Sequence, residues 1–201
     1  MTTEPRVAPA AERNKSPIAN VLLERFAPEG TLLEIASGFG QHAVYLAELL
    51  PSWTITPTDI AREHVLEIEH RRVVAGLGNL QPAIALNAEH LPWPLRDLDA
   101  VLNVNMIHIS PWSASVGLLR GAGASLRPGG RLFTYGPYTI DGEHTAESNR
   151  AFEQRLRSMD PRFGIRDIAE LEREAERSGL TLTERVEMPA NNFTLVFERR
   201  P

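Results

Sequence analysis

Short apolar runs alternate with segments of helical spacing along the first two thirds of the chain. The runs are rich in Leu, Ile, Val and Thr, which is typical of buried strands. They are residues 31–35, 53–58, 83–86, 100–104 and 131–135. Between them, residues 42–50 and 62–77 carry apolar side chains three or four positions apart. This alternation predicts a parallel sheet covered by helices on both faces.

The C-terminal third has a different order of elements. A helix is expected over residues 146–159, and Asp167 with Glu170 resembles a capping box at the start of another. Segments 181–187 and 193–198 are both strand-like, and the connection between them is too short for a parallel crossover. They are therefore expected to pair antiparallel. The whole pattern predicts an α/β fold with a seven-stranded, mostly parallel sheet and an antiparallel last strand.

The N-terminus shows no periodicity over residues 1–10, which are rich in Pro, Ala and Thr and are expected to form a flexible tail. Ser16 followed by Pro17 predicts a helix start, because serine caps helices and proline suits their first position. A chain of 201 residues fits one compact domain, expected over residues 11–201.

Composition and charge exclude several classes of protein. Hydrophobic residues make up 42% of the chain and charged residues 23%, close to the average for globular proteins. The net charge of −5, without a cluster of Lys and Arg, argues against a nucleic-acid partner. No apolar run is long enough to cross a bilayer and no signal peptide is visible at the start, so we expect a cytoplasmic protein without a membrane partner. The oligomeric state stays open.

Metal and thiol chemistry are not expected. The chain has no cysteine, which excludes a disulfide framework, a thiolate nucleophile and a cysteine zinc site. Its 6 histidines show no repeated ligand spacing.

A glycine loop lies between the first strand and the following helix. Glycines at 38 and 40 let the backbone approach a ligand closely, and the loop fits both dinucleotide-binding proteins and proteins that bind S-adenosylmethionine (SAM). Glu34 ends the strand before the loop, where an acid would repel a pyrophosphate but pair with an ammonium group, directly or through water. Asp59 ends the second strand, where a carboxylate accepts ribose hydroxyls in both classes. Glu34 therefore favours SAM.

Several segments together carry a closer resemblance. They are Ala10–Ile18, Ile35–His42, Asn103–Trp112, Tyr135–Tyr138 and Asp160–Asp167. The chain is similar to the small methyltransferase-like family that includes human methyltransferase-like protein 26, long known only as a domain of unknown function. The resemblance implies a Rossmann-like class I methyltransferase fold with SAM as cofactor and S-adenosylhomocysteine as product. It leaves the methyl acceptor unnamed.

The resemblance and the residue types together predict a cofactor site. The expected residues are Arg13, Asn14, Glu34, Ala36, Ser37, Gly38, Gly40, His42, Asp59, Asn87, Ala88, Glu89 and Asn103. Arg13 is expected to donate to the SAM carboxylate as its segment folds over the cofactor. Asn87 stands where related proteins carry an acid against adenine, and Glu89 is the alternative acceptor. His42 fits a pocket wall and a helix surface equally well.

Two residues are expected at the acceptor. His108 follows the fourth strand at the edge where open α/β sheets bind ligands, as a base or an orienting group; the alternative is a structural histidine that caps the next helix. Tyr138 leaves the fifth strand at the same edge. The acceptor is expected to be a small molecule with an O, N or S nucleophile. A non-catalytic SAM-binding protein and an NAD-dependent oxidoreductase are the alternatives.

Overall fold

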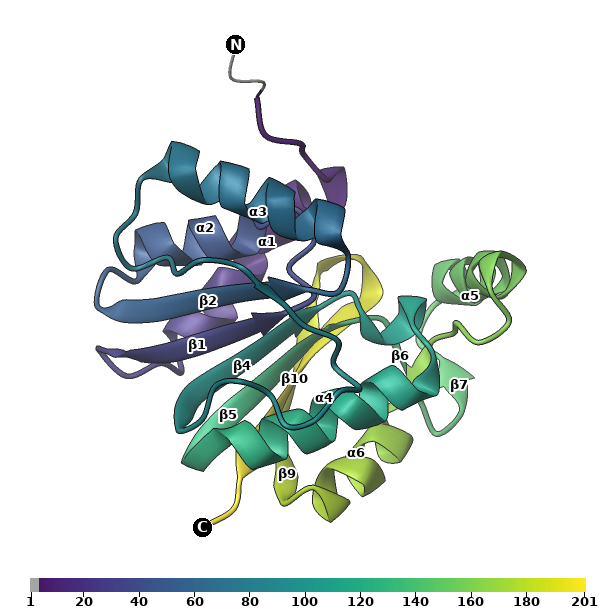
Figure 1. Cartoon of the computed structure of the whole chain (residues 1–201). Helices are drawn as coiled ribbons and strands as arrows, with labels where there is room; N and C mark the ends of the chain where they lie inside the picture. Colours follow the sequence, from purple (N-terminus) through teal and green to yellow (C-terminus); the bar gives the residue numbers. More distant parts are fainter. Residues whose placement is uncertain (1–3) are drawn as a thin grey trace.

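The structure, a computed structural model, describes residues 4–201 and is built around a central sheet (Figure 1). The strands are β1 (Gly30–Ile35), β2 (Trp53–Asp59), β3 (Ile84–Ala85), β4 (Leu98–Val104), β5 (Leu126–Gly136), β9 (Leu180–Met188) and β10 (Asn192–Arg199). They form a seven-stranded sheet in the order β3-β2-β1-β4-β5-β10-β9. Strand β10 runs antiparallel to both of its neighbours, while β1 to β5 are parallel. The predicted fold class is confirmed.

Helices cover both faces of this sheet. They are α1 (Pro9–Leu23), α2 (Gln41–Leu49), α3 (Arg62–Ala75), α4 (Trp112–Ser125), α5 (Glu147–Met159) and α6 (Ile168–Arg177). Figure 1 shows α1, α2 and α3 on one side of the sheet and α4 and α6 on the other. Successive strand residues point to opposite faces, so Leu32 joins the core beneath α1 and α2 while Leu33 joins the core beneath α4 and α6.

The C-terminal elements follow the prediction closely. Strands β9 and β10 pair antiparallel through the short 3-10 turn Pro189–Asn191. The Asp167 carboxylate accepts a hydrogen bond from the Ala169 N–H at 2.9 Å and so caps α6. The hydrophobic pattern missed a second sheet of three strands, β6 (Tyr138–Ile140), β7 (Glu143–His144) and β8 (Arg166–Asp167). Strands this short carry no readable alternation.

The start of α1 differs from the prediction. The helix begins at Pro9 and contains Ser16 and Pro17 in its interior. Pro9 occupies a first-turn position, where its missing N–H would have had no helical partner, and Pro17 removes only one internal hydrogen bond. The expected tail therefore overlaps the helix at residues 9 and 10, and residues 1–3 of that tail lie outside the described part.

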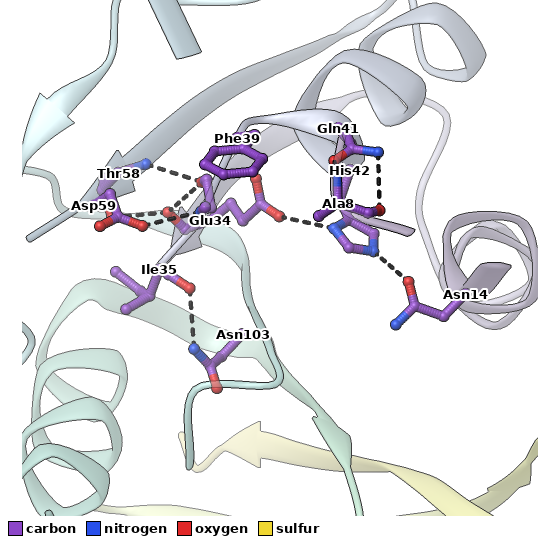
Figure 2. A network of polar contacts seen from close by, with 12 residues as sticks. Ala8, Asn14, Glu34, Ile35, Phe39, Gln41, His42, Thr58, Asp59 and Asn103 are labelled. Atoms are coloured by element: carbon purple, nitrogen blue, oxygen red, sulfur yellow. Dashed lines mark hydrogen bonds and ion pairs between the residues drawn. The ribbon is translucent and has the colours of Figure 1, made fainter. Parts of the chain in front are cut away.

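The residue before α1 is held against the glycine-loop region. The Ala8 N–H donates to Gln41 Oε1 at 2.7 Å, and Gln41 Nε2 donates back to the Ala8 carbonyl at 3.3 Å (Figure 2). This contact brings the N-terminal segment to the carboxyl edge of the sheet.

Strand order reverses between β1 and β4, and the carboxyl edge at that point is the usual place for ligands in open α/β sheets. Asn103 bridges the two strands there, because its Nδ2 donates to the Ile35 carbonyl at 2.9 Å (Figure 2). No helix within residues 4–201 is long and apolar enough to span a membrane.

Candidate functional site

A cavity of about 690 Å³ opens where β1, β2 and β4 end. We refer to it as the glycine-loop cavity. Its lining includes Ala8, Ala10, Ala11, Ile35–Phe39, Gln41, His42, Asp59–Ala61, Leu86–Glu89, Val104–Met106 and Phe163. The volume lies within the range of small-molecule sites. Ala8 and the first turn of α1 form one wall, whereas Arg13, which was expected over the cofactor, is not in this lining.

The glycine loop depends on backbone conformations that glycine adopts readily. Gly38 has a φ of 58° and Gly40 a φ of 76°. A Cβ on Gly40 would also lie 3.2 Å from Ile68 Cγ1, whereas a Cβ on Gly38 would meet no atom within 4 Å. Gly38 therefore leaves open space beside the backbone, and its N–H donates to Asp59 Oδ2 at 2.9 Å.

Asp59 organises the ends of β1 and β2. Its Oδ1 accepts from the Ala61 N–H at 2.9 Å and lies 3.1 Å from His64 Nδ1, in addition to the Gly38 contact at Oδ2. The residue is 4% exposed and lines the cavity. A carboxylate offers about four acceptor positions, so one remains for a ligand donor without rearrangement of the loop.

Glu34 is a carboxyl group enclosed in the protein one layer behind the cavity lining. It is 1% exposed, and its Oε2 has no hydrogen-bond partner in the described chain. Burial raises the pKa of Glu34 to about 7, with a smaller raising effect from Asp59 and a lowering effect of the Ser37 hydrogen bond. Its Oε2 is therefore a buried acceptor oxygen that nothing in the described chain satisfies.

A line of polar groups connects Glu34 to α1 (Figure 2). Glu34 Oε1 lies 3.9 Å from His42 Nδ1, and His42 Nε2 lies 2.8 Å from Asn14 Oδ1. Because an amide oxygen only accepts, His42 Nε2 carries the hydrogen. Burial lowers the pKa of His42 to about 4, so the imidazole is neutral at neutral pH. His42 lines the cavity, as one of its two sequence interpretations expected.

The structure brings most of the predicted cofactor residues to this cavity. Those in its lining are Ala36, Ser37, Gly38, His42, Asp59, Asn87, Ala88 and Glu89. Glu34, Gly40 and Asn103 are outside the lining, and Asn103 is fully buried with an unpartnered Oδ1. Its contact with Ile35 makes it a bridge between strands. Arg13 and Asn14 line a different cavity.

The two candidate adenine acceptors both carry internal contacts. Asn87 Oδ1 accepts from the Glu89 N–H at 2.9 Å, and Glu89 Oε1 accepts from Ser113 Oγ at 2.9 Å. Each oxygen retains a free lone pair, so both alternatives stay open.

The second cavity, of about 750 Å³, adjoins the first. Ala10, Asn105 and Ile109 line both. The remaining residues of the second cavity are Arg13, Asn14, Pro17, His108, Tyr135, Pro137, Ser148, Asn149, Phe152, Arg155 and Pro189–Asn192. Three distant parts of the chain, α1, α5 and the turn between β9 and β10, therefore meet around it.

His108 faces this second cavity with its ring edge against the Phe152 ring, the centroids 5.5 Å apart. It is 5% exposed, and burial together with the nearby Arg166 charge lowers its pKa to about 4. The imidazole is neutral at neutral pH and holds a proton weakly. It can orient a ligand by hydrogen bonding.

Tyr138 does not lie at the acceptor side, and that prediction is wrong. Its side chain is fully buried in the core beneath α4 and α6, and its hydroxyl donates to Thr134 Oγ1 at 2.9 Å. Burial raises the pKa of Tyr138, so the hydroxyl stays protonated. Tyr135 lines the second cavity instead.

Sequence reasoning missed Asn105 and the loop residues Arg162 and Phe163 as parts of the site. Asn105 directly follows β4 and lines both cavities, with its backbone N–H bonded to the Tyr135 carbonyl at 2.9 Å. The sequence signal that could have identified Asn105 as a site residue was its position just past the end of a strand. Arg162 and Phe163 reach the glycine-loop cavity from beyond α5, which no local pattern indicates. Within residues 4–201, no group of three or more His, Asp or Glu side chains is placed to hold a metal ion.

Comparison with known proteins places the chain in a family. Residues 5–199 match the family described as "Protein of unknown function (DUF938)". The chain belongs to DUF938. This DUF938 member is also 36% identical over 99 residues to a "Fatty-acid O-methyltransferase" of Mycolicibacterium smegmatis, an alignment that covers 49% of the chain and 34% of that protein.

Solved structures show what the fold resembles. The DUF938 chain superposes on the apo form of the SAM-dependent methyltransferase SibL with a TM-score of 0.79 at 20% identity, covering 96% of this chain and 56% of that one. With CalO1, a methyltransferase of calicheamicin biosynthesis in its S-adenosylhomocysteine-bound form, the TM-score is 0.78 at 16% identity, covering 94% and 54%. The chain thus spans little more than half the length of these structures. The class I methyltransferase fold is confirmed, while the relationship to the human protein stays a prediction.

Proposed function

We propose that this DUF938 protein transfers a methyl group from SAM to a small-molecule acceptor bound at the carboxyl edge of its sheet. The observation that carries the proposal is the glycine-loop cavity, which combines an open glycine backbone and the Asp59 carboxylate in its lining with the unpartnered Glu34 oxygen behind it. The methyltransferase relatives and the shared fold support it.

The cavity residues fit SAM. Gly38 leaves room for a ligand against the backbone, and Asp59 retains an acceptor position for a ribose hydroxyl. Glu34 offers a carboxyl oxygen to the amino group of the methionine moiety, directly or through water. Leu86 and Ala88 supply apolar surface of the kind that an adenine ring covers.

NAD fits less well. Its pyrophosphate would bring negative charge to a loop that lies directly against Glu34 and Asp59. Arg13, the predicted partner of the SAM carboxylate, lines the second cavity, so we assign it to the acceptor side. The backbone of the glycine loop and the first turn of α2 remain to receive that carboxylate.

Bound SAM supplies an electrophilic methyl carbon on its sulfonium. The chain then has to position the acceptor's nucleophile in line with that carbon and keep water away. Asn105 lines both cavities and is placed to contact the reacting groups, and neutral His108 can orient the acceptor. A cytoplasmic location, as predicted from the sequence, belongs to the same proposal.

Ligand titration against thermal stability tests the proposal. SAM and S-adenosylhomocysteine should raise the unfolding midpoint, because a ligand at 100 times its Kd stabilises the native state by about 2.7 kcal/mol. NAD at the same concentrations should leave the midpoint unchanged. A shift with NAD and none with either SAM compound would overturn the proposal.

A further inference from the structure

Two arginines without partners face the second cavity. Several exposed arginines of the described chain pair with a carboxylate, as Arg120 does with Glu174 at 3.2 Å. The Arg13 and Arg155 side chains make no ion pair or hydrogen bond within residues 4–201, and Arg155 lies 5.6 Å from the centre of the Phe152 ring. The lining contains no Asp or Glu. The cavity therefore carries positive charge in a protein whose net charge is −5.

The rest of the lining suits an organic anion with an apolar body. Phe152, Pro17 and Pro137 supply apolar surface. The Tyr135 hydroxyl is a further donor, because burial raises its pKa and keeps it protonated, while the Asn14 hydrogen bond and the Arg13 charge lower it. A cavity of about 750 Å³ has room for a metabolite-sized molecule.

The lining offers only a weak base for removing a proton at neutral pH. It has no carboxylate, and its histidine, His108, has a pKa lowered to about 4 by burial. An alcohol or phenol that must lose its proton during methyl transfer would find only this weak acceptor here. A nucleophile that is already an anion at neutral pH needs none.

The two cavities meet at Asn105, Ala10 and Ile109. A ligand in the second cavity can therefore extend its nucleophilic end toward a cofactor in the first without crossing the core. Arg13 lies on α1 one turn beyond Ala10, so its charge is close to this junction.

We infer that the second cavity binds a small carboxylic acid as its carboxylate, held by Arg13 and Arg155, and that the methyl group is transferred to a carboxylate oxygen. This rests on the proposed function. The oxygen forms a bond to the methyl carbon while the carbon–sulfur bond breaks and its electron pair stays on sulfur. The products are a methyl ester and the uncharged thioether S-adenosylhomocysteine, and no proton is released or consumed.

Matched acceptors test the substrate class. We would incubate the full chain and SAM carrying a labelled methyl group with phenylacetate, benzoate and octanoate, and in parallel with phenylacetamide, benzyl alcohol and 1-octanol. Label should enter only the carboxylates, and alkali should release it as methanol, which is the signature of a methyl ester. A labelled, alkali-stable product from the amide or the alcohols would overturn the inference. So would a protein that binds S-adenosylhomocysteine but forms no methyl ester from any of the three carboxylates.

Variants and a binding readout test the arginines. Arg13→Gln and Arg155→Gln should each raise the KM for the carboxylate about 10- to 100-fold, the effect of losing one charged hydrogen bond, and leave the Kd of S-adenosylhomocysteine unchanged. Arg173→Gln, an exposed arginine on α6 outside both cavities, is the matched control. Independently of turnover, the carboxylates should raise the unfolding midpoint of the S-adenosylhomocysteine complex, and Arg13→Gln should remove that shift.

Equal KM values in the Arg13, Arg155 and Arg173 variants would overturn the inference. Failure of the proposed function would look different. A protein that binds neither SAM nor S-adenosylhomocysteine would contradict the methyltransferase assignment itself.

Discussion

Replacing Glu34 by glutamine removes a buried carboxyl group whose ionisation opposes folding. The ordinary pKa of 4.5 applies to the unfolded chain, and burial raises the folded value to about 7. Below pH 4.5 the group is protonated in both states and makes no pH-dependent contribution. Between pH 4.5 and 7 the unfolded chain releases the proton while the folded protein keeps it, so stability falls with rising pH and is constant above pH 7. At about 1.36 kcal/mol per pKa unit, the total is about 3 kcal/mol.

The wild-type curve alone does not isolate this effect. His42 and His108 have pKa values lowered to about 4 from 6.5, so the unfolded chain binds more protons than the folded one between those values. Their contribution makes stability rise with pH over that interval, which offsets Glu34. The diagnostic quantity is therefore the difference in unfolding free energy between Glu34→Gln and wild type.

Denaturant titrations of the ligand-free protein at pH 4.5 and pH 8 measure that difference. From pH 4.5 to pH 8, the unfolding free energy of Glu34→Gln should rise by about 3 kcal/mol relative to that of the wild type. Glu29→Gln, at an exposed carboxylate outside both cavities, should show no such shift. If the unfolding free energy of Glu34→Gln, relative to wild type, changes no more with pH than that of Glu29→Gln, the reasoning about the buried carboxyl group is refuted.

Glu34 should also couple the binding of SAM to the release of protons. A cationic amino group near Glu34 favours the carboxylate, so SAM binding at pH 7 should release about half a proton, as expected for a group with a pKa near the working pH. Calorimetry in buffers of different ionisation enthalpy measures the release. Glu34→Gln should release none and bind SAM about tenfold more weakly, and an unchanged affinity and proton count would contradict the predicted role in cofactor binding.

Three other substitutions test the assignments around the sheet. Asp59→Asn should weaken SAM binding about 10- to 100-fold in calorimetry, because a charged acceptor is lost, and equal affinity would remove Asp59 from the site. Tyr138→Phe should lower the unfolding free energy by about 1 kcal/mol through the lost bond to Thr134, and kcat should stay unchanged because the residue lines neither cavity. Gly121→Ala places a Cβ into the Trp93 ring and should cost about 1–3 kcal/mol in denaturant unfolding; an unaltered midpoint would show that α4 packs more loosely than described.

The sequence by itself determined the kind and order of most elements. Alternating apolar runs and helical segments specified a parallel sheet, and the short connection after β9 left only antiparallel pairing with β10. The Asp167 cap and the glycine loop were readable for the same reason, since each depends on a few neighbouring residues. Local periodicity and turn chemistry carry this information because they act within a few residues.

Only the tertiary structure decided which side chains meet. Tyr135 and Tyr138 stand three residues apart near one sheet edge, yet one lines a cavity and the other is enclosed beneath α4 and α6. Arg13 was expected beside the cofactor but lines the second cavity, together with Arg155 of a helix far along the chain. The pKa of Glu34 depends likewise on how completely the folded chain excludes water from it. Burial and cavity walls arise from contacts between segments distant in sequence, and spacing along the chain does not encode which of those segments lie against each other.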